Sequence, residues 1–203
     1  MVKAIVFDIG GVLIDLDLDR CIHAFREILG FERITELLDP SHQKGIYGEM
    51  EAGRLSADHF RELILAESRP GCTPEDVNRA MAALLVQMPS ATAKLVKELA
   101  TRYPLYLLSN NNSISMARIH AIFRENGIDP DTTFRHEFIS CDMKLMKPSQ
   151  ACYREVIWRI GLPAQEILFI DDNAANVDAA REAGMQARYY IPGSDLSLLL
   201  ADL

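Results

Sequence analysis

The chain begins MVKAIVFDIGGV at residues 1–12, where an apolar run, Lys3–Phe7, ends at Asp8 and is followed by Gly10 and Gly11. A short, continuous apolar run is typical of a strand that helices cover on both faces. A carboxylate directly after such a strand is exposed, and the glycines allow a ligand to approach the backbone closely. Asp8 is therefore a candidate nucleophile, since carboxylates can attack phosphorus to form an aspartyl-phosphate. Many buried strands, however, end in an Asp that only caps a turn.

Two other apolar runs end in polar clusters in the same way. Leu105–Leu108 is followed by Ser109 and a run of asparagines, and Ile167–Ile170 is followed by Asp171 and Asp172. Strands that alternate with helices predict an α/β fold with a doubly wound parallel sheet, in which the polar clusters meet at one crevice. The other elements expected in this alternation are the weaker strands Glu137–Cys141 and Gln186–Ile191 and the helices Ala91–Tyr103, Ser113–Asn126, Ser149–Ile160 and Asn173–Ala183.

Residues 19–88 break the alternation, because they are poor in strand patterns and rich in helical ones. Ser56 and Thr73 are typical N-caps of two of these helices. We expect a small all-helical cap domain at 19–88, inserted after the first strand, and an α/β core domain made of 1–18 and 89–203. A single long layer of covering helices is the alternative. The helices expected here are Arg20–Leu29, Ile34–Leu38, Ser41–Glu51, Ser56–Glu67 and Thr73–Val86.

The composition limits the class of protein. The 203 residues carry a formal net charge of −8, which argues against general nucleic-acid binding, since that requires a basic face. No apolar run approaches the roughly 18 residues of a transmembrane helix, and the N-terminus indicates a strand, not a signal peptide. The four cysteines are scattered and contain no CxxC pair. We therefore expect a cytoplasmic monomer or homodimer that contains no disulfide or zinc and binds no membrane or nucleic acid.

The adjacent acids Asp171 and Asp172 indicate a cation site. Two carboxylates after a buried apolar run are costly unless a positive charge compensates them. A hard cation with oxygen ligands is the natural partner, and Mg²⁺ typically takes one or two carboxylates, waters and a substrate phosphate. Helix capping and stabilisation of the helix dipole by Asp172 is the alternative.

Ser109 and Asn110 are candidates for a phosphate cradle, because hydroxyl, amide and backbone N–H groups at a strand-to-helix junction bind anions. On local sequence alone, ordinary helix capping explains them better. Lys147 precedes Pro148, where we expect a helix to begin. A cation at that place opposes the helix dipole unless an anion is near, so we expect Lys147 to point at carboxylates or phosphate.

In this order, Asp8, Ser109, Lys147-Pro148 and Asp171-Asp172 resemble the four motifs of the haloacid dehalogenase-like hydrolase superfamily, over nearly the whole chain. Within it, the strongest resemblance is to the α-D-glucose-1-phosphate phosphatase type. The similarity lies in FDIGGV at 7–12, in the Ser-Asn pair and in DDNAAN at 171–176. This resemblance also implies a helical cap inserted after the first strand.

The resemblance assigns a role to each motif. Asp8 would attack phosphorus, Ser109 and Asn110 would hold the phosphoryl oxygens, and Lys147 would balance the charge on Asp8 and the phosphoryl group. Mg²⁺ would be held by the residues of two motifs, namely Asp8, the backbone carbonyl of Gly10, and Asp172 supported by Asp171. The implied function is a magnesium-dependent phosphomonoesterase that acts on a small phosphorylated metabolite, such as a sugar phosphate, through an aspartyl-phosphate on Asp8.

Gly10 departs from the pattern of most phosphatases of this superfamily. They carry a second Asp at this position, which protonates the leaving group and later activates water, a role typically worth about 10²–10⁴-fold in rate. Asp15, Asp17 and Glu49 are candidate substitutes. Two other functions stay open, a metal-independent 2-haloacid dehalogenase and a non-catalytic protein that binds a phosphorylated ligand.

The expected cap would set substrate specificity. Tyr47, Glu49, Arg54 and His23 are candidates to face the substrate, although helix surface positions or packing would also explain them.

Overall fold

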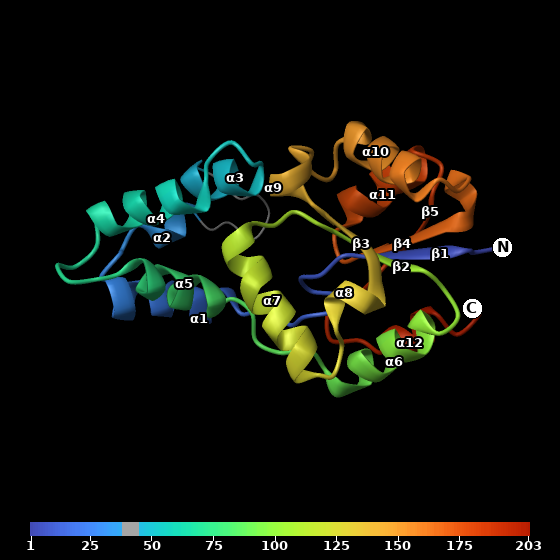
Figure 1. Cartoon of the computed structure of the whole chain (residues 1–203), viewed down its shortest axis with the longest axis horizontal. Helices are drawn as coiled ribbons and strands as arrows, with labels where there is room; N and C mark the ends of the chain where they lie inside the picture. Colours follow the sequence, from blue (N-terminus) through green and yellow to red (C-terminus); the bar gives the residue numbers. More distant parts are fainter. Residues whose placement is uncertain (38–44) are drawn as a thin grey trace.

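A five-stranded sheet lies at the centre of the structure, a computed structural model that describes residues 1–37 and 45–203 (Figure 1). All of its strand pairs are parallel. This confirms the predicted α/β fold with a doubly wound parallel sheet. In the order β3-β2-β1-β4-β5, the strands are β3 (Phe134–Ile139), β2 (Leu105–Ser109), β1 (Ala4–Phe7), β4 (Ile167–Asp171) and β5 (Gln186–Tyr189).

Helices cover both faces of this sheet. Side chains alternate along a strand, so that Ile5 and Phe7 of β1 pack into the core on one face and Val6 into the core on the other. Both faces exclude water, which explains why the strands are continuous apolar runs. The first face is covered by α6 (Ser90–Ala100), α7 (Ser113–Glu125) and α12 (Leu196–Leu199), and the second by α10 (Gln150–Ile160) and α11 (Ala174–Glu182).

The strand order places a topological switch point next to β1. From β1 the chain proceeds outward on one side through β2 to β3, and on the other through β4 to β5. In open α/β sheets a ligand crevice forms at such a point, beyond the carboxyl ends of the strands. Asp8 follows β1, Ser109 ends β2 and Asp171 ends β4, so these three residues lie at that edge.

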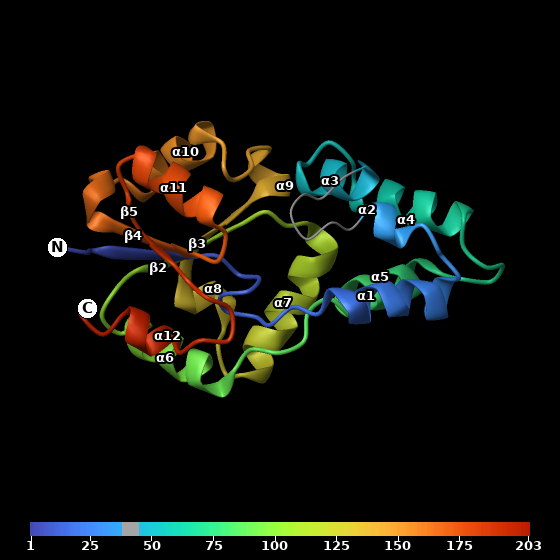
Figure 2. The same ribbon diagram turned by 180° about the vertical axis from the view of Figure 1, so that it is seen from behind.

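A group of helices between β1 and β2 has a hydrophobic core of its own, which includes Phe25, Tyr47, Phe60 and Val77. In Figure 2 these helices lie at the end of the molecule away from both chain termini. The described parts of residues 19–88 contain no strand. The helical group consists of α1 (Leu18–Ala24), the π-helix η1 (Phe25–Leu29), α2 (Ile34–Leu37), α3 (Gly45–Glu51), α4 (Ala57–Ala66) and α5 (Pro74–Ala82).

The N-caps predicted for α4 and α5 are confirmed. The Ser56 hydroxyl accepts a hydrogen bond from the His59 N–H at 3.2 Å. Thr73 and Asp76 form a reciprocal capping box, in which the Asp76 carboxylate accepts from the Thr73 N–H at 2.8 Å. These contacts satisfy helix N–H groups that have no partner within the helix.

Two neighbouring segments connect the helical group to the sheet. The Asp17 N–H donates to the Leu84 carbonyl, and Asp15 exchanges hydrogen bonds with Val86 and Gln87, all at 2.9 Å. This short antiparallel pairing holds the outgoing and returning chains together. The domain boundaries expected near it, at 18/19 and 88/89, stay a prediction.

Some predicted elements begin or end elsewhere. The helix predicted over Ser149–Ile160 is α10, which begins one residue later, at Gln150, because the Ser149 side chain caps it. The helix start expected at Pro148 is therefore wrong. The strand predicted over Glu137–Cys141 ends at Ile139, where the chain turns into the short helix α9 (Ser140–Met143). Of the helices predicted over Ile34–Leu38 and Ser41–Glu51, residue 38 and residues 41–44 lie outside the described residues.

Three short elements were not predicted from the sequence patterns. They are α8 (Pro130–Thr133), the 3₁₀ helix η2 (Ala164–Glu166) and α12.

Within residues 1–37 and 45–203, no helix combines the length and the apolar character needed to cross a membrane.

Gly53 lies where the helical group meets the sheet domain. Its backbone is left-handed, with φ +69°, and a Cβ built there would lie 2.2 Å from the Cys141 carbonyl oxygen. Any larger residue would therefore push α3 away from α9.

A matched pair of glycine substitutions tests this contact. Gly53→Ala and Gly71→Ala both place an Ala at positive φ, which costs about 1–2 kcal/mol. Only Gly53→Ala also collides with backbone, because nothing lies within 4 Å of a Cβ at Gly71. We expect Gly53→Ala to lower the free energy of unfolding by at least about 1 kcal/mol more than Gly71→Ala, as measured by urea denaturation. Equal losses would show that the two segments are not in tight contact.

Candidate active site

A cavity of about 330 Å³ lies at the carboxyl edge of the sheet, between the sheet and the helical group. One wall comes from the strand ends and the loops after them, and the other comes from α3 and the connecting segments. Sequence-predicted residues from all four motifs line it. The residues of its walls include Asp8, Gly10, Ser109, Asn110, Lys147 and Asp172 on the first side and Leu16, Tyr47 and Glu51 on the second.

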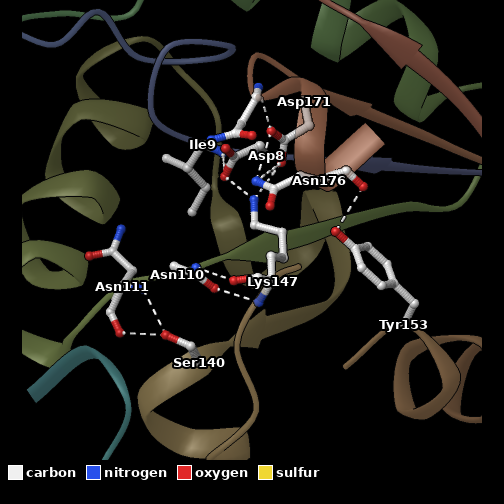
Figure 3. A network of polar contacts seen from close by, with 10 residues as sticks. Asp8, Ile9, Asn110, Asn111, Ser140, Lys147, Tyr153, Asp171 and Asn176 are labelled. Carbon is white, nitrogen blue, oxygen red and sulfur yellow. Dashed lines mark hydrogen bonds and ion pairs between the residues drawn. The ribbon is translucent and has the colours of Figure 1, made fainter. Parts of the chain in front are cut away.

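Lys147 is the cation at the centre of this site (Figure 3). Its Nζ lies 2.9 Å from Asp8 Oδ1 and 2.6 Å from Asp171 Oδ2. The Lys147 side chain is 1% exposed and that of Asp171 is fully buried. The prediction that Lys147 points at carboxylates is confirmed, although it does not directly precede a helix.

Asp171 is held by hydrogen bonds on both of its oxygens. The Asn173 N–H donates to Oδ1 at 2.8 Å, and the Asn176 side-chain amide donates to both oxygens at 3.0 and 3.1 Å. Tyr153 in turn donates to the Asn176 carbonyl at 2.9 Å. These donors fix the orientation of Asp171, which then fixes Lys147.

The Asn110 side chain binds the backbone of Lys147. Its amide donates to the Lys147 carbonyl and its oxygen accepts from the Lys147 N–H, both at 2.9 Å. These two hydrogen bonds hold the Asn110 side chain against the Lys147 backbone. Ser109 lines the same cavity and is 4% exposed.

Burial and charge oppose each other in this cluster. Burial raises the pKa of the Asp8 carboxyl to about 7, and the neighbouring Lys147 keeps it from rising further. Burial lowers the pKa of Lys147, but the two carboxylates beside it outweigh this effect and raise it. Lys147 therefore stays charged, and a second cation near Asp8 would favour the ionised carboxylate that a nucleophile needs.

Asp8, Asp171 and Asp172 can each offer a carboxylate oxygen to one cation, since these oxygens lie within 4.8 Å of one another. Burial raises the pKa of the Asp172 carboxyl, and the neighbouring Asp171 adds to this rise. Gly11 makes room for Asp172, because a Cβ on Gly11 would lie 2.1 Å from Asp172 Oδ2. These hard oxygen donors match the preference of Mg²⁺.

Leu16 fills the place of a side chain at Gly10. A Cβ built on Gly10 would lie 2.9 Å from the Leu16 Cδ1 atom. The backbone of Gly10 is not in the left-handed region, so the tip of Leu16 is the obstacle, and Leu16 is 46% exposed.

Glu51 is a residue of the cavity that sequence patterns missed. It ends α3, is 5% exposed and lines the cavity together with Tyr47, four residues earlier on the same helix face. Burial raises the pKa of Glu51 to about 8, the nearby Asp8 adds to this rise, and Lys147 opposes it. The Glu51 carboxyl group therefore holds its proton at neutral pH. Its spacing of four residues from Tyr47, about one helical turn, was a usable signal that the two side chains share one face of α3.

Ser140 was also missed, and it joins the helical group to the motif loops. Its hydroxyl donates to the Glu51 carbonyl at 2.6 Å and accepts from the Asn111 N–H at 2.9 Å. The contact bridges 89 positions of sequence, so local patterns gave no signal for it.

Several predicted candidates lie outside the cavity. The Asp17 carboxylate caps α1, and Asp15 accepts a hydrogen bond from Gln87. Glu49 and Arg54 form an exposed ion pair at 2.7 Å. His23 lines a different cavity, next to α5. Of the candidates to face the substrate, Tyr47 alone lines the cavity that contains Asp8.

Known proteins share both the sequence pattern and the fold. The family model of the haloacid dehalogenase-like hydrolases matches residues 2–184. A D-ribitol-5-phosphate phosphatase from Bacteroides thetaiotaomicron is 30% identical over 196 residues, which cover 96% of this chain and 95% of the relative.

Solved structures agree with these sequence matches. A haloacid dehalogenase family enzyme from B. thetaiotaomicron, in complex with magnesium and inorganic phosphate, superposes with a TM-score of 0.90 at 30% identity, covering 98% of this chain and 99% of its own. A predicted hydrolase of the same family from Porphyromonas gingivalis has a TM-score of 0.87 at 31% identity, covering 100% and 97%.

Removing the buried cation should destabilise the fold. Lys147→Met leaves Asp8 and Asp171 buried without their partner, so we expect the free energy of unfolding at pH 8 to fall by about 3–5 kcal/mol. Lys144→Met, at an exposed position, should change it by less than about 0.5 kcal/mol. Urea denaturation without metal measures both.

The loss in Lys147→Met should also depend on pH. Without Lys147, the pKa of Asp8 rises further above its value in the unfolded chain, so the folded state binds a proton more tightly. The variant should recover stability as the pH falls from 8 to 5, and lose it as the pH rises through the raised pKa. A loss that is the same at both pH values would contradict this electrostatic account.

Proposed function

Because the chain belongs to the haloacid dehalogenase-like hydrolase family, we propose that it is a magnesium-dependent phosphatase that acts on a small phosphorylated sugar or sugar alcohol. The observation that carries the proposal is the carboxylate of Asp8, in contact with a buried cation and within a cluster of three carboxylates that can share a metal ion. This cluster faces a cavity of about 330 Å³, a size that suits a small ligand.

In the proposed reaction, Asp8 acts as the nucleophile. One of its oxygens forms a bond to phosphorus while the bond from phosphorus to the leaving alcohol oxygen breaks, and that oxygen takes up a proton. Water then attacks the aspartyl-phosphate, which releases inorganic phosphate and restores the Asp8 carboxylate. Lys147 holds the attacking carboxylate in place and offsets negative charge as the phosphoryl group approaches.

Ser109 and Asn110 support the same reaction as a neutral cradle. Ser109 ends β2, Asn110 follows it, and both residues line the cavity. Both can donate to phosphoryl oxygens without adding charge. Asn110 has a second role, because its side chain fixes the backbone of Lys147.

We propose that Asp8, the Gly10 carbonyl and Asp172 hold Mg²⁺, with Asp171 in support. The donor set fits, since it contains only oxygen atoms and lies beside the expected position of the phosphate. When bound, Mg²⁺ would neutralise charge on the phosphoryl oxygens. A solved relative contains magnesium and inorganic phosphate.

The substrate class rests on two similarities. A relative that matches 96% of this chain acts on D-ribitol-5-phosphate, and the motif residues resemble the α-D-glucose-1-phosphate phosphatase type. The helices of residues 19–88 form the second wall of the cavity, and we propose that they act as a cap that selects among such substrates.

Gly10 favours a second candidate function. A chain without the usual acid at this position would bind a phosphorylated ligand without turning it over. A metal-independent 2-haloacid dehalogenase is a third candidate, but the carboxylate of Asp172 argues against it. Ligand binding by calorimetry without turnover would favour the second candidate. Halide release from 2-haloacids in the presence of a chelator would favour the third.

Phosphate release tests the main proposal. The substrates to compare are p-nitrophenyl phosphate, D-ribitol-5-phosphate and α-D-glucose-1-phosphate. We expect Mg²⁺-dependent release of phosphate from at least one of them. Asp8→Asn should lower kcat by at least about 10³-fold, because an amide cannot form the aspartyl-phosphate. Asp178→Asn, an exposed Asp on α11, should leave kcat unchanged. No turnover against a broad panel of phosphorylated metabolites would sink the proposal.

The metal site has a separate test. Asp172→Asn should raise the Mg²⁺ concentration for half-maximal activity by at least about 10-fold, because it removes a charged ligand. Activity should return at high Mg²⁺ if the fold is intact. An unchanged Mg²⁺ requirement would remove Asp172 from the proposed ligand set.

A further inference from the structure

The proposed reaction requires a proton at the leaving oxygen, and the residue at the usual position cannot supply it. Gly10 has no side chain, and the apolar tip of Leu16 lies 2.9 Å from where its Cβ would be. The candidates Asp15, Asp17 and Glu49 lie outside the cavity. An acid would therefore have to come from another part of the cavity wall.

Most ionisable groups on that wall are already engaged. Asp8 is the nucleophile, Asp172 belongs to the carboxylate cluster, and Lys147 is held between two carboxylates. Burial raises the pKa of the Tyr47 phenol well above its ordinary value, so Tyr47 is a poor proton donor. Among the described residues that line the cavity, Glu51 is the carboxyl group that has no such role.

The position of Glu51 suits the leaving oxygen. In an in-line displacement at phosphorus, the leaving oxygen lies on the side opposite the attacking atom. Asp8 attacks from the sheet edge, so the leaving oxygen faces the wall formed by α3. Glu51 ends α3 on that wall, is 5% exposed, and its carboxyl group accepts and donates no hydrogen bond among the described residues.

The backbone around Glu51 is fixed relative to the strand ends. Ser140 donates to its carbonyl at 2.6 Å, and Ser140 also binds the loop after β2 through Asn111. Two residues further on, Gly53 packs so closely on the Cys141 carbonyl that a Cβ would not fit. An acid held in this way keeps its distance from the phosphate cradle, as proton transfer requires.

We propose that Glu51 is a catalytic residue that replaces the missing acid at Gly10, an inference that rests on the proposed phosphatase function. In the first step the O–H bond of the Glu51 carboxyl breaks and its proton passes to the leaving oxygen, which leaves as an alcohol. Glu51 is then a carboxylate. In the second step it takes a proton from the attacking water, as the new bond to phosphorus forms and the bond to Asp8 breaks.

Substrates with different leaving groups test this role. An alkoxide, as in D-ribitol-5-phosphate, needs a proton to leave, whereas p-nitrophenolate leaves without one. Glu51→Gln should lower kcat/KM for the alkyl phosphate by about 10²–10⁴-fold and that for p-nitrophenyl phosphate by only a few-fold. Glu62→Gln, at an exposed position on α4, should change neither.

The outcomes separate the two proposals. Equal losses on both substrates, or no loss on either, would overturn the role of Glu51 while the phosphatase function stands. A wild-type protein that releases phosphate from neither substrate would overturn both proposals.

A second variant checks that Glu51→Gln acts on chemistry and not on folding. Gly10→Asp together with Leu16→Ala, introduced into Glu51→Gln, should restore alkyl phosphate hydrolysis at least 10-fold by returning an acid to the usual position.

Discussion

The ammonium group of Lys147, buried between Asp8 and Asp171, is the interaction on which the rest of the site depends. An unpaired charge in this setting would cost several kcal/mol, so each of the three groups requires the others. The hydrogen bonds of Asn176 and Asn173 orient Asp171, and those of Asn110 orient the Lys147 backbone. The strand ends are therefore held in one arrangement before any ligand arrives.

The sequence predicted the sheet and the motif positions well, because both depend on local patterns. Apolar runs that end in Asp8, Ser109 and Asp171 mark buried parallel strands, and the strand-end rule for open sheets then brings them together. The direction of Lys147 was predicted from its charge and from a helix start at Pro148. That start is wrong, because Ser149 is the N-cap and α10 begins at Gln150.

The rest of the site could not be predicted from such patterns. Glu51 reaches the cavity only because α3 packs against α9, through a hydrogen bond to Ser140 that spans 89 positions. The more visible Glu49, two residues earlier on the helix, points to solvent and pairs with Arg54. Helix phase and long-range packing decide which of two neighbouring acids lines a cavity. The spacing of Glu51 from Tyr47 reveals the phase, but nothing in the residues around them reveals the packing of α3 on α9.

The contact between Ser140 and Glu51 links the position of the helical group to the timing of the chemistry. Any motion of this group away from the sheet would break this hydrogen bond and separate Glu51 from the strand ends. Under the proposed role of Glu51, an open molecule can therefore carry the nucleophile but not the proton donor. Bond breaking would then wait for closure, and a ligand too large to permit that closure would be bound without being cleaved.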